Sequence, residues 1–267
     1  MTAEGGSAPT RRWPMDELIA HRYWVRRLKP FPYVTVQNVF NQAFYDTLED
    51  HYRRIAADGT KFNTSTPGYD ASMALIRDNL DGPLAVFTSR EWHDMIAGIA
   101  GIAGIAGVVC TGDVSASLHQ HQPGGNAGWP HNDLNPGWFA GPTPNDTETR
   151  YEGTDGVDYR TGKRPDGVEA RETVRAVAVL FYLANPPWEP EDGGETGLFA
   201  SLAAGQRGDG ALIPPLNNSM VMFECTPFSW HGYAGASRNE RNCVAMWLHR
   251  PKQDIIETFG EASIVYW

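Results

Sequence analysis

One pattern of metal-binding residues limits the fold of this 267-residue chain more than any other feature. His131 and Asp133 are separated by a single residue, and His231 follows much later in the chain. Successive side chains of a β-strand alternate between its two faces, so His131 and Asp133 would point the same way if residues 129–133 were extended. A second strand could then bring His231 beside them. The pattern therefore predicts a fold in which two distant extended segments lie side by side.

Two imidazoles and one carboxylate can occupy one side of a metal ion and leave the opposite positions open. This arrangement suits the iron of non-haem Fe(II) oxygenases. A His-x-Asp pair alone is common by chance, so the assignment needs support from elsewhere in the chain. His119 and His121 also form a His-x-His pair, which offers a competing zinc-type site.

Arg241 supplies that support, because it opens an apolar run over residues 242–248. A charge at the start of a buried strand is costly unless it is paired. The planar guanidinium of arginine is suited to a bidentate contact with a carboxylate. A dicarboxylate cosubstrate lying between a metal ion and Arg241 would provide such a partner.

In their order along the chain, these motifs resemble the prolyl-hydroxylase-like branch of the Fe(II)/2-oxoglutarate-dependent dioxygenases. The resemblance covers residues 30–250 and rests on Lys29-Pro30-Phe31-Pro32-Tyr33-Val34, His121-Gln122-Pro123-Gly124-Gly125, His131-x-Asp133, Val179–Asn185, Trp188 with Gly193-Gly194-Glu195-Thr196, and His231 with Arg241. It implies a mainly β fold with flanking helices (α+β), built as a double-stranded β-helix, or cupin-like jelly roll. The many short strands and the turns rich in Gly and Pro favour the same class.

The resemblance also implies the roles of individual residues. It assigns Fe(II) to His131, Asp133 and His231. It assigns 2-oxoglutarate to Arg241, Tyr182, His121 and Trp247. His121 departs from the family pattern, because it stands where a tyrosine hydroxyl commonly contacts the cosubstrate. O2 is the second cosubstrate, and ascorbate is a candidate stimulant.

A long segment, residues 134–172, is rich in Gly, Pro, Asp, Thr and Arg and separates two predicted strands. A loop of this length inside a compact domain is usually functional or disordered. We expect a lid-like insert that contributes to substrate choice. The candidate substrate-binding residues are Trp129, Trp138, Arg150, Arg160, Tyr69 and Arg77. For each arginine taken alone, a solvated surface position is the simpler interpretation.

Hydrophobic periodicity and capping residues predict the main elements. We expect helices over residues 14–29 and 41–57 and from Ser89 onward, and strands over 33–40, 114–121, 173–183, 195–200, 219–224, 229–233 and 241–249. Residues 1–12 are predicted to be a disordered tail. Residues 13–267 are predicted to form a single dioxygenase domain. The apolar C-terminal residues 264–267 are expected to dock on the body or on a second subunit, so a homodimer is one option.

Composition narrows the range of partners. The net charge of −10 argues against nucleic-acid binding by bulk electrostatics. The three cysteines have neither zinc-finger spacing nor the pattern of a disulfide framework. The chain has no apolar N-terminal segment and no run of 18 apolar residues, so we expect a cytoplasmic protein without a membrane partner.

The resemblance implies hydroxylation of an unactivated C–H bond, with succinate and CO2 as coproducts. We expect a small-molecule substrate, either a free amino acid or another small metabolite, because the insert is charged and no broad peptide groove is indicated. A peptidyl-prolyl (protein) hydroxylase is the alternative within the class. A metal-binding, cupin-like sensor or binding protein is the alternative of another class, although a binding module would have no need of the iron-binding set together with Arg241. A cupin-like zinc or iron hydrolase or isomerase is also open, but Arg241 has no obvious purpose there.

Overall fold

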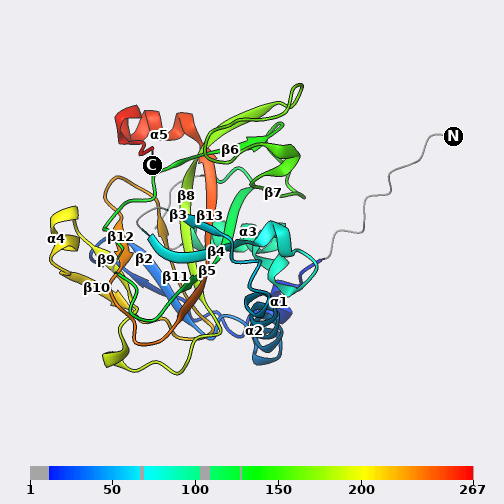
Figure 1. The fold of residues 1–267 in the computed structure, drawn as a ribbon. Coiled ribbons are helices and arrows are strands. Elements are labelled where there is room, and N and C mark those ends of the chain that lie inside the picture. The colour runs from blue at the N-terminus through cyan, green and yellow to red at the C-terminus, as the bar shows by residue number, and fades with distance from the viewer. Residues whose placement is uncertain (1–11, 67–68, 103–108, 127, 267) are drawn as a thin grey trace.

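The molecule is built on one large sheet with a smaller sheet beside it, and the long helices α2 (Gln42–Ala57) and α3 (Arg90–Ile102) lie on the opposite side (Figure 1). The computed structural model describes residues 12–66, 69–102, 109–126 and 128–266. The strands are β1 (Val25–Arg27), β2 (Tyr33–Gln37), β3 (Thr64–Thr66), β4 (Tyr69–Leu75), β5 (Asp113–His121), β6 (Pro136–Ala140), β7 (Arg150–Tyr151), β8 (Ala170–Tyr182), β9 (Thr196–Phe199), β10 (Gly210–Ile213), β11 (Ser219–Glu224), β12 (Trp230–Tyr233) and β13 (Arg241–Pro251). The helices are α1 (Met15–Leu18), α2 (Gln42–Ala57), α3 (Arg90–Ile102), α4 (Leu202–Gln206) and α5 (Lys252–Phe259).

The large sheet contains ten strands in the order β1-β2-β11-β8-β13-β5-β4-β3, with β6 paired to β8 and β7 paired to β5. The small sheet has the order β10-β9-β12. Apolar side chains of β8, β11 and β13 pack against Leu198 of β9, and this contact forms the core between the two sheets. The central strands are buried on both faces, which is why they read as continuous apolar runs in the sequence.

Helices α2 and α3 cover the face of the large sheet that lies away from the small sheet (Figure 1). Helix α2 begins after Asn41, whose side-chain oxygen accepts a hydrogen bond from the Phe44 N–H at 2.9 Å. Phe40 is fully buried between the helices and the sheet, where its ring stacks on Trp92 at 5.2 Å and meets Phe181 edge-on at 5.4 Å. The helices predicted over residues 41–57 and from Ser89 onward are therefore confirmed.

Three predicted elements differ in the structure. The helix expected over residues 14–29 is helical only in α1, because residues 25–27 pair with β2 instead and form β1. Residues 129–133 do not form a strand; a single bridge joins His131 to His231. The segment predicted as an insert over 134–172 includes β6, the two-residue strand β7 and the start of β8, and residues 141–169 are irregular apart from β7 and one short 3-10 turn. The predicted tail of residues 1–12 lies outside the described residues except for Arg12.

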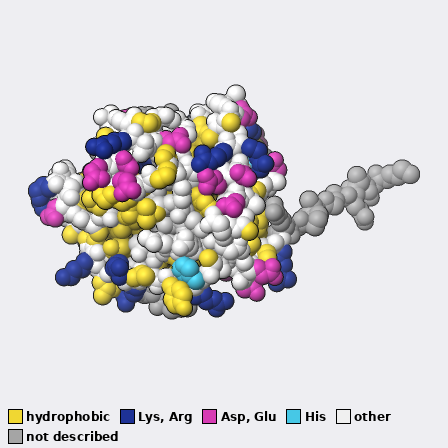
Figure 2. Space-filling model, turned by 90° about the horizontal axis from the view of Figure 1, so that it is seen from below, with side chains coloured by type: hydrophobic (Ala, Val, Ile, Leu, Met, Phe, Trp, Pro, Cys, Tyr) yellow, Lys and Arg dark blue, Asp and Glu magenta, His cyan; other side chains and the backbone are white. Residues whose placement is uncertain are grey.

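The C-terminal segment docks on the body, because the Val265 N–H donates to the Leu134 carbonyl at 3.0 Å and Ile264 is buried. On the face shown in Figure 2, basic side chains lie among acidic and hydrophobic ones. Within the described ranges, none of the helices has the length and apolar character needed to cross a bilayer.

Candidate metal centre and its cavity

His131, Asp133 and His231 meet at a cavity of about 410 Å³ that residues of both sheets line. One ligand-type atom from each of the three residues lies within 4.8 Å of the other two. Asp133 Oδ2 is 3.2 Å from His231 Nε2, and Asp133 Oδ1 is 3.9 Å from His131 Nε2. Among the described residues, these three form the one group of His, Cys, Asp or Glu side chains whose spacing could hold a metal ion.

The backbone brings the two histidines together through a single pair of reciprocal hydrogen bonds. The His131 N–H donates to the His231 carbonyl at 2.9 Å, and the His231 N–H donates to the His131 carbonyl at 2.8 Å. Their rings lie 4.4 Å apart between centroids. The sequence predicts two paired strands here, and one bridge is enough to produce the same proximity.

Each imidazole is oriented by a carbonyl two residues before it. His131 Nδ1 lies 2.8 Å from the Trp129 carbonyl oxygen, and His231 Nδ1 lies 3.0 Å from the Ser229 carbonyl oxygen. A carbonyl only accepts hydrogen bonds, so Nδ1 of each ring donates to it, and Nε2 is the nitrogen that faces Asp133 and could bind a metal ion. Burial lowers the pKa of His131 to about 4, which keeps that ring neutral. Both Nε2 atoms are therefore suited to bind a metal ion.

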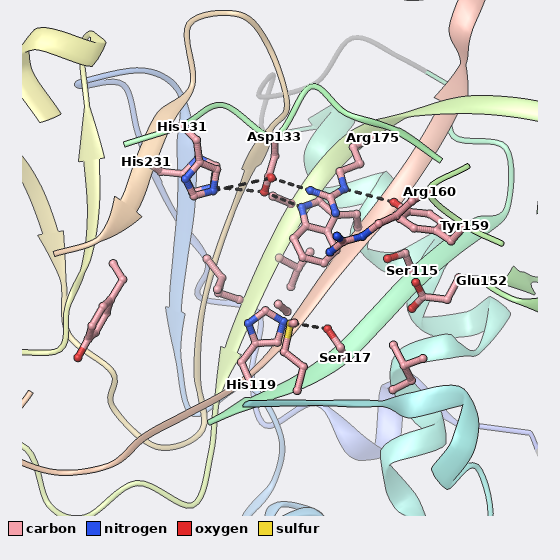
Figure 3. A pocket seen from close by; sticks show the side chains of 18 of the residues that line it. Ser115, Ser117, His119, His131, Asp133, Glu152, Tyr159, Arg160, Arg175 and His231 are labelled. Atoms are coloured by element: carbon pink, nitrogen blue, oxygen red, sulfur yellow. Dashed lines mark hydrogen bonds and ion pairs between the residues drawn. The ribbon is translucent and has the colours of Figure 1, made fainter. Parts of the chain in front are cut away.

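Asp133 is held as a carboxylate by two neighbours (Figure 3). Arg175 Nη1 donates to Oδ1 at 2.6 Å, and Trp247 Nε1 donates to Oδ2 at 2.7 Å. The Arg175 guanidinium also lies over the Trp247 ring, 3.8 Å from its centroid. Burial acts to raise the pKa of Asp133, but Arg175 and His231 outweigh burial and hold it below its ordinary value. A carboxylate accepts about four hydrogen bonds, so lone pairs remain for a metal ion. The donor set thus fits Fe(II), with two imidazoles and one anionic oxygen.

Arg241 borders the same cavity and is only 2 % exposed. Its Nε donates to the Gly194 carbonyl at 2.8 Å, and its Nη2 donates to the Thr196 hydroxyl at 2.7 Å. The Tyr182 hydroxyl lies 2.7 Å from the same Thr196 oxygen. Tyr182 is outside the described cavity lining, whereas Thr196 is part of it. A carboxylate placed beside Thr196 would therefore meet a guanidinium and a hydroxyl.

The other residues predicted to contact 2-oxoglutarate occupy different positions. Trp247 lines the cavity, but its indole N–H is directed at Asp133. His121 is fully buried, stacks on Tyr233 at 4.4 Å, and lies opposite Arg241 in the pairing of β5 with β13. Burial lowers the pKa of His121 to about 2, so its ring is neutral. His119 lines the cavity, 2.9 Å from the Ser117 hydroxyl, and belongs to no three-residue metal group among the described residues.

The predicted substrate-binding residues divide into two groups. Trp129, Arg77 and Arg160 line the cavity. Trp138 and Arg150 lie outside its described lining: Trp138 packs over Gly162, and Arg150 donates to the Ala140 carbonyl. The side chain of Tyr69 lies outside the part of the chain that the structure describes.

Sequence patterns had not pointed to several residues of the cavity. Arg175 interrupts the apolar run of β8, so the cost of burying an unpaired charge, which drew attention to Arg241, applies to it as well. Glu152 and Tyr159 carry no comparable signal, because they reach the cavity only through the pairing of β7 with β5 and the folding of the segment that follows. Together with Ser115, these two residues lie on the side of the cavity away from His131 and His231 (Figure 3).

Comparisons with known proteins bear on the family and the fold. Residues 148–249 match the model of the 2OG-Fe(II) oxygenase superfamily; this region includes His231 and Arg241. No curated protein matches the chain. A Pseudomonas putida prolyl-4-hydroxylase structure is similar, with a TM-score of 0.55 and 16% identity over 84% of this chain and 95% of that one. A Trichoplax adhaerens prolyl hydroxylase, solved with a peptide fragment of the hypoxia inducible factor oxygen degradation domain, has a TM-score of 0.54 and 16% identity over 83% and 85% of the two chains.

At this level of identity, the structural neighbours establish the fold, and it is the double-stranded β-helix expected from the motifs. The superfamily match supports the expected enzyme class and its iron and 2-oxoglutarate chemistry. The fold and the enzyme class predicted from the sequence are therefore confirmed, and residues 148–249 match the predicted superfamily.

Proposed function

We propose that this chain, an enzyme of the 2OG-Fe(II) oxygenase type, hydroxylates an unactivated C–H bond of a small molecule. The observation that carries the proposal is the cavity of about 410 Å³, which contains His131, Asp133 and His231 together with Arg241. A cavity of several hundred Å³ has the size of a small-molecule site. A free amino acid or a metabolite of similar size would fit this volume.

In this proposal, Fe(II) is held by His131, Asp133 and His231. The far carboxylate of 2-oxoglutarate is held by Arg241 with Thr196, both of which line the cavity. When bound, iron and 2-oxoglutarate supply the chemistry of oxygen activation, in which the keto acid becomes succinate and CO2. The protein contributes binding, orientation and exclusion of side reactions.

The chain's own residues prepare this site. The carbonyls of Trp129 and Ser229 keep the two imidazoles in the tautomer that presents Nε2. Arg175 and Trp247 hold the Asp133 carboxylate ionised and fixed in orientation. The apolar residues that line the cavity, among them Val179, Leu180 and Ala245, limit the access of water.

A peptidyl-prolyl substrate is the second candidate. Its support is that both structural neighbours are prolyl hydroxylases by name and that one was solved with a peptide. The segment 141–169 favours the small molecule, because four of its consecutive residues, Val157 to Arg160, form part of the cavity lining. The two candidates differ in product, since a peptide substrate would yield a hydroxylated prolyl chain.

An anaerobic titration tests the cofactor assignment. Fe(II) followed by 2-oxoglutarate should produce the weak visible charge-transfer band of a chelated keto acid in the wild-type protein. The band should be absent in His231→Ala and Asp133→Ala. A folded, iron-loaded wild type without the band would overturn the proposal.

A second titration tests Arg241 separately. Arg241→Ala should raise the 2-oxoglutarate concentration needed for the band by roughly 10- to 150-fold, because a charge-assisted hydrogen-bonded contact is lost. Arg150→Ala is the matched control, since Arg150 lies outside the described cavity lining. An unchanged requirement in Arg241→Ala would place the far carboxylate elsewhere.

A further inference from the structure

A second set of polar side chains lines the cavity away from the metal ligands, and the proposed iron chemistry does not use it. The set consists of Ser115 of β5 and Glu152 and Tyr159 of the segment after β7 (Figure 3). Any role of this set in binding a substrate rests on the proposed function of the same cavity.

The backbone explains how Glu152 reaches this position. Strand β7 pairs with β5 in parallel, with Tyr151 opposite Val114. The Glu152 N–H donates to the Val114 carbonyl at 3.2 Å, and the Glu152 Oε1 accepts from the Ala116 N–H at 3.1 Å. The Glu152 side chain thus accepts the next hydrogen bond from β5, just beyond the point where the backbone pairing of β7 ends. One neutral oxygen is enough for that structural task, so a glutamine could perform it too.

The charge of Glu152 has no such structural explanation. Glu152 is 8 % exposed, and among the described residues no arginine, lysine or histidine nitrogen lies within 4.0 Å of its carboxylate. The two cations whose charges act on Glu152, Arg77 and Arg175, are engaged with other groups. Arg77 donates to the main-chain carbonyl of Glu152 at 2.9 Å and lies 3.6 Å from Asp78, while Arg175 is paired with Asp133. A buried carboxylate without a close counter-charge is unfavourable, and a bound cation would relieve this cost.

Burial, only partly offset by Ala116, Arg77, Arg175 and Ser115, raises the pKa of Glu152 to about 7. A cationic ligand would favour the ionised carboxylate again. The raised pKa is consistent with the position of this carboxyl group, which is buried and has no close counter-charge among the described residues.

Ser115 and Tyr159 complete the cluster. Ser115 lines the cavity beside Glu152 and Tyr159 (Figure 3). The Tyr159 hydroxyl oxygen accepts from Arg175 Nε at 3.3 Å and lies 3.2 Å from His249 Nε2. Three oxygen-bearing groups therefore converge on one side of the cavity, and this arrangement suits a ligand nitrogen that carries several hydrogen-bond donors.

We propose that Glu152, together with Ser115 and Tyr159, forms a subsite for a basic nitrogen of the substrate. The substrate class is then a small molecule with an amine, bound so that its nitrogen lies at Glu152 and its oxidised carbon lies toward His131 and His231. Glu152 acts in substrate selection and takes no part in binding iron or 2-oxoglutarate.

The test uses three probes with the same four-carbon chain: n-butylammonium, n-butanol and butyrate. Their binding to the metal-free protein is measured at pH 8 by ligand-observed NMR, so that neither iron nor turnover is needed. We expect n-butylammonium to bind about tenfold more tightly than n-butanol, in line with a charge-assisted hydrogen bond. Butyrate binding should be unchanged in E152Q, because a carboxylate is expected at Arg241 and not at Glu152.

The decisive variant is E152Q, which keeps an acceptor for the Ala116 N–H and removes the charge. It should lose the preference for n-butylammonium over n-butanol. D166N is the matched control, because Asp166 is an exposed acid of the same segment outside the described cavity lining. Y159F provides a second variant within the cluster and should weaken the preference in part if E152Q fails to fold.

Two results would overturn the subsite: equal binding of n-butylammonium and n-butanol to the wild type, or an undiminished preference in folded E152Q. These results do not depend on the charge-transfer band. A missing band with an intact probe preference would overturn the iron and 2-oxoglutarate proposal instead, so the two failures can be told apart.

Discussion

At the scale of single residues, Arg175 connects the two ends of the cavity. It donates to Asp133 of the proposed metal site at 2.6 Å and to the Tyr159 hydroxyl in the Glu152 cluster at 3.3 Å. Its charge keeps the pKa of Asp133 low, in opposition to burial, and at longer range it opposes the effect of burial on Glu152. One buried cation thus supports a carboxylate that must remain ionised, and a second carboxyl group titrates nearby.

The raised pKa of Glu152 leads to a prediction about stability and pH. The carboxyl group has an ordinary pKa of 4.5 and a pKa of about 7 in the folded protein, where Arg77, Arg175 and Tyr159 face it. The folded protein therefore holds this proton more tightly than the unfolded chain. The resulting stabilisation is complete below about pH 4.5 and is lost as the pH rises through about 7.

Glu152→Gln lacks this titration. The free energy of unfolding of the variant, relative to wild type, should therefore rise between pH 4.5 and pH 8 by up to about 3 kcal/mol. Urea denaturation at a series of pH values measures the difference. Asp166→Asn, which alters an exposed acid, should show no such trend, and a flat difference for Glu152→Gln would contradict the prediction.

At the scale of elements, a tight turn carries Tyr159 and Arg160 into the cavity. Asp158 Oδ1 accepts from the N–H groups of Arg160 and Thr161, and the Gly162 N–H donates to the Asp158 carbonyl at 2.9 Å. Gly162 has a φ of +68° and lies against the ring of Trp138 in β6. Trp138, predicted as a substrate-binding residue, instead packs against this turn from outside the described cavity lining.

Gly162→Ala should therefore displace the turn. An added Cβ would lie 2.5 Å from Trp138 Cδ2, in addition to the cost of a left-handed conformation for alanine. Gly167→Ala is the matched control, because Gly167 has a φ of +80° and an added Cβ would have no atom within 4 Å.

Gly167→Ala should lower the free energy of unfolding by about 1–2 kcal/mol, the usual penalty for a non-glycine residue in this left-handed backbone conformation. Gly162→Ala should cost more and should speed amide hydrogen exchange over residues 141–169. Equal effects of the two substitutions would show that the contact with Trp138 does not hold the turn.

At the scale of the whole molecule, the two sheets form a rigid frame for ligands that are distant in the sequence. His131 and Asp133 lie in a loop after β5, and His231 lies in β12 of the small sheet. A metal ion bound by all three residues therefore links parts of the chain that separate on unfolding. Metal binding is expected to stabilise the folded state as a whole.

The expected stabilisation is about 2.7 kcal/mol at a free metal concentration of 100 times Kd. Urea denaturation with Co(II), compared with a sample in EDTA, measures this difference. Asp133→Ala should remove most of it, because the site loses its one anionic ligand. Identical midpoints with and without metal in the wild type would contradict the assignment of the three ligands.

Local patterns account for the parts of this fold that could be predicted. Helix α2 and strands β5, β8, β11 and β13 lie close to their predicted positions, because capping at Asn41 and runs of apolar residues act over a few neighbouring positions. The helix predicted over residues 14–29 was wrong for residues 25–27, because pairing with β2 overrode a local preference. Capping residues and runs of apolar residues do not indicate which distant strand a segment pairs with.

By itself, the sequence determined the residue types of the proposed metal site, their order along the chain, the buried arginine of β13 and the class of fold. Each of these depends on chemistry or periodicity that a short stretch of chain contains. Only the tertiary structure decided that Arg175 pairs with Asp133 and that Glu152, Ser115 and Tyr159 converge on one side of the cavity. The physical reason is that these contacts join β5, β8 and the segment after β7, whose approach depends on long-range strand pairing and packing of the sheets.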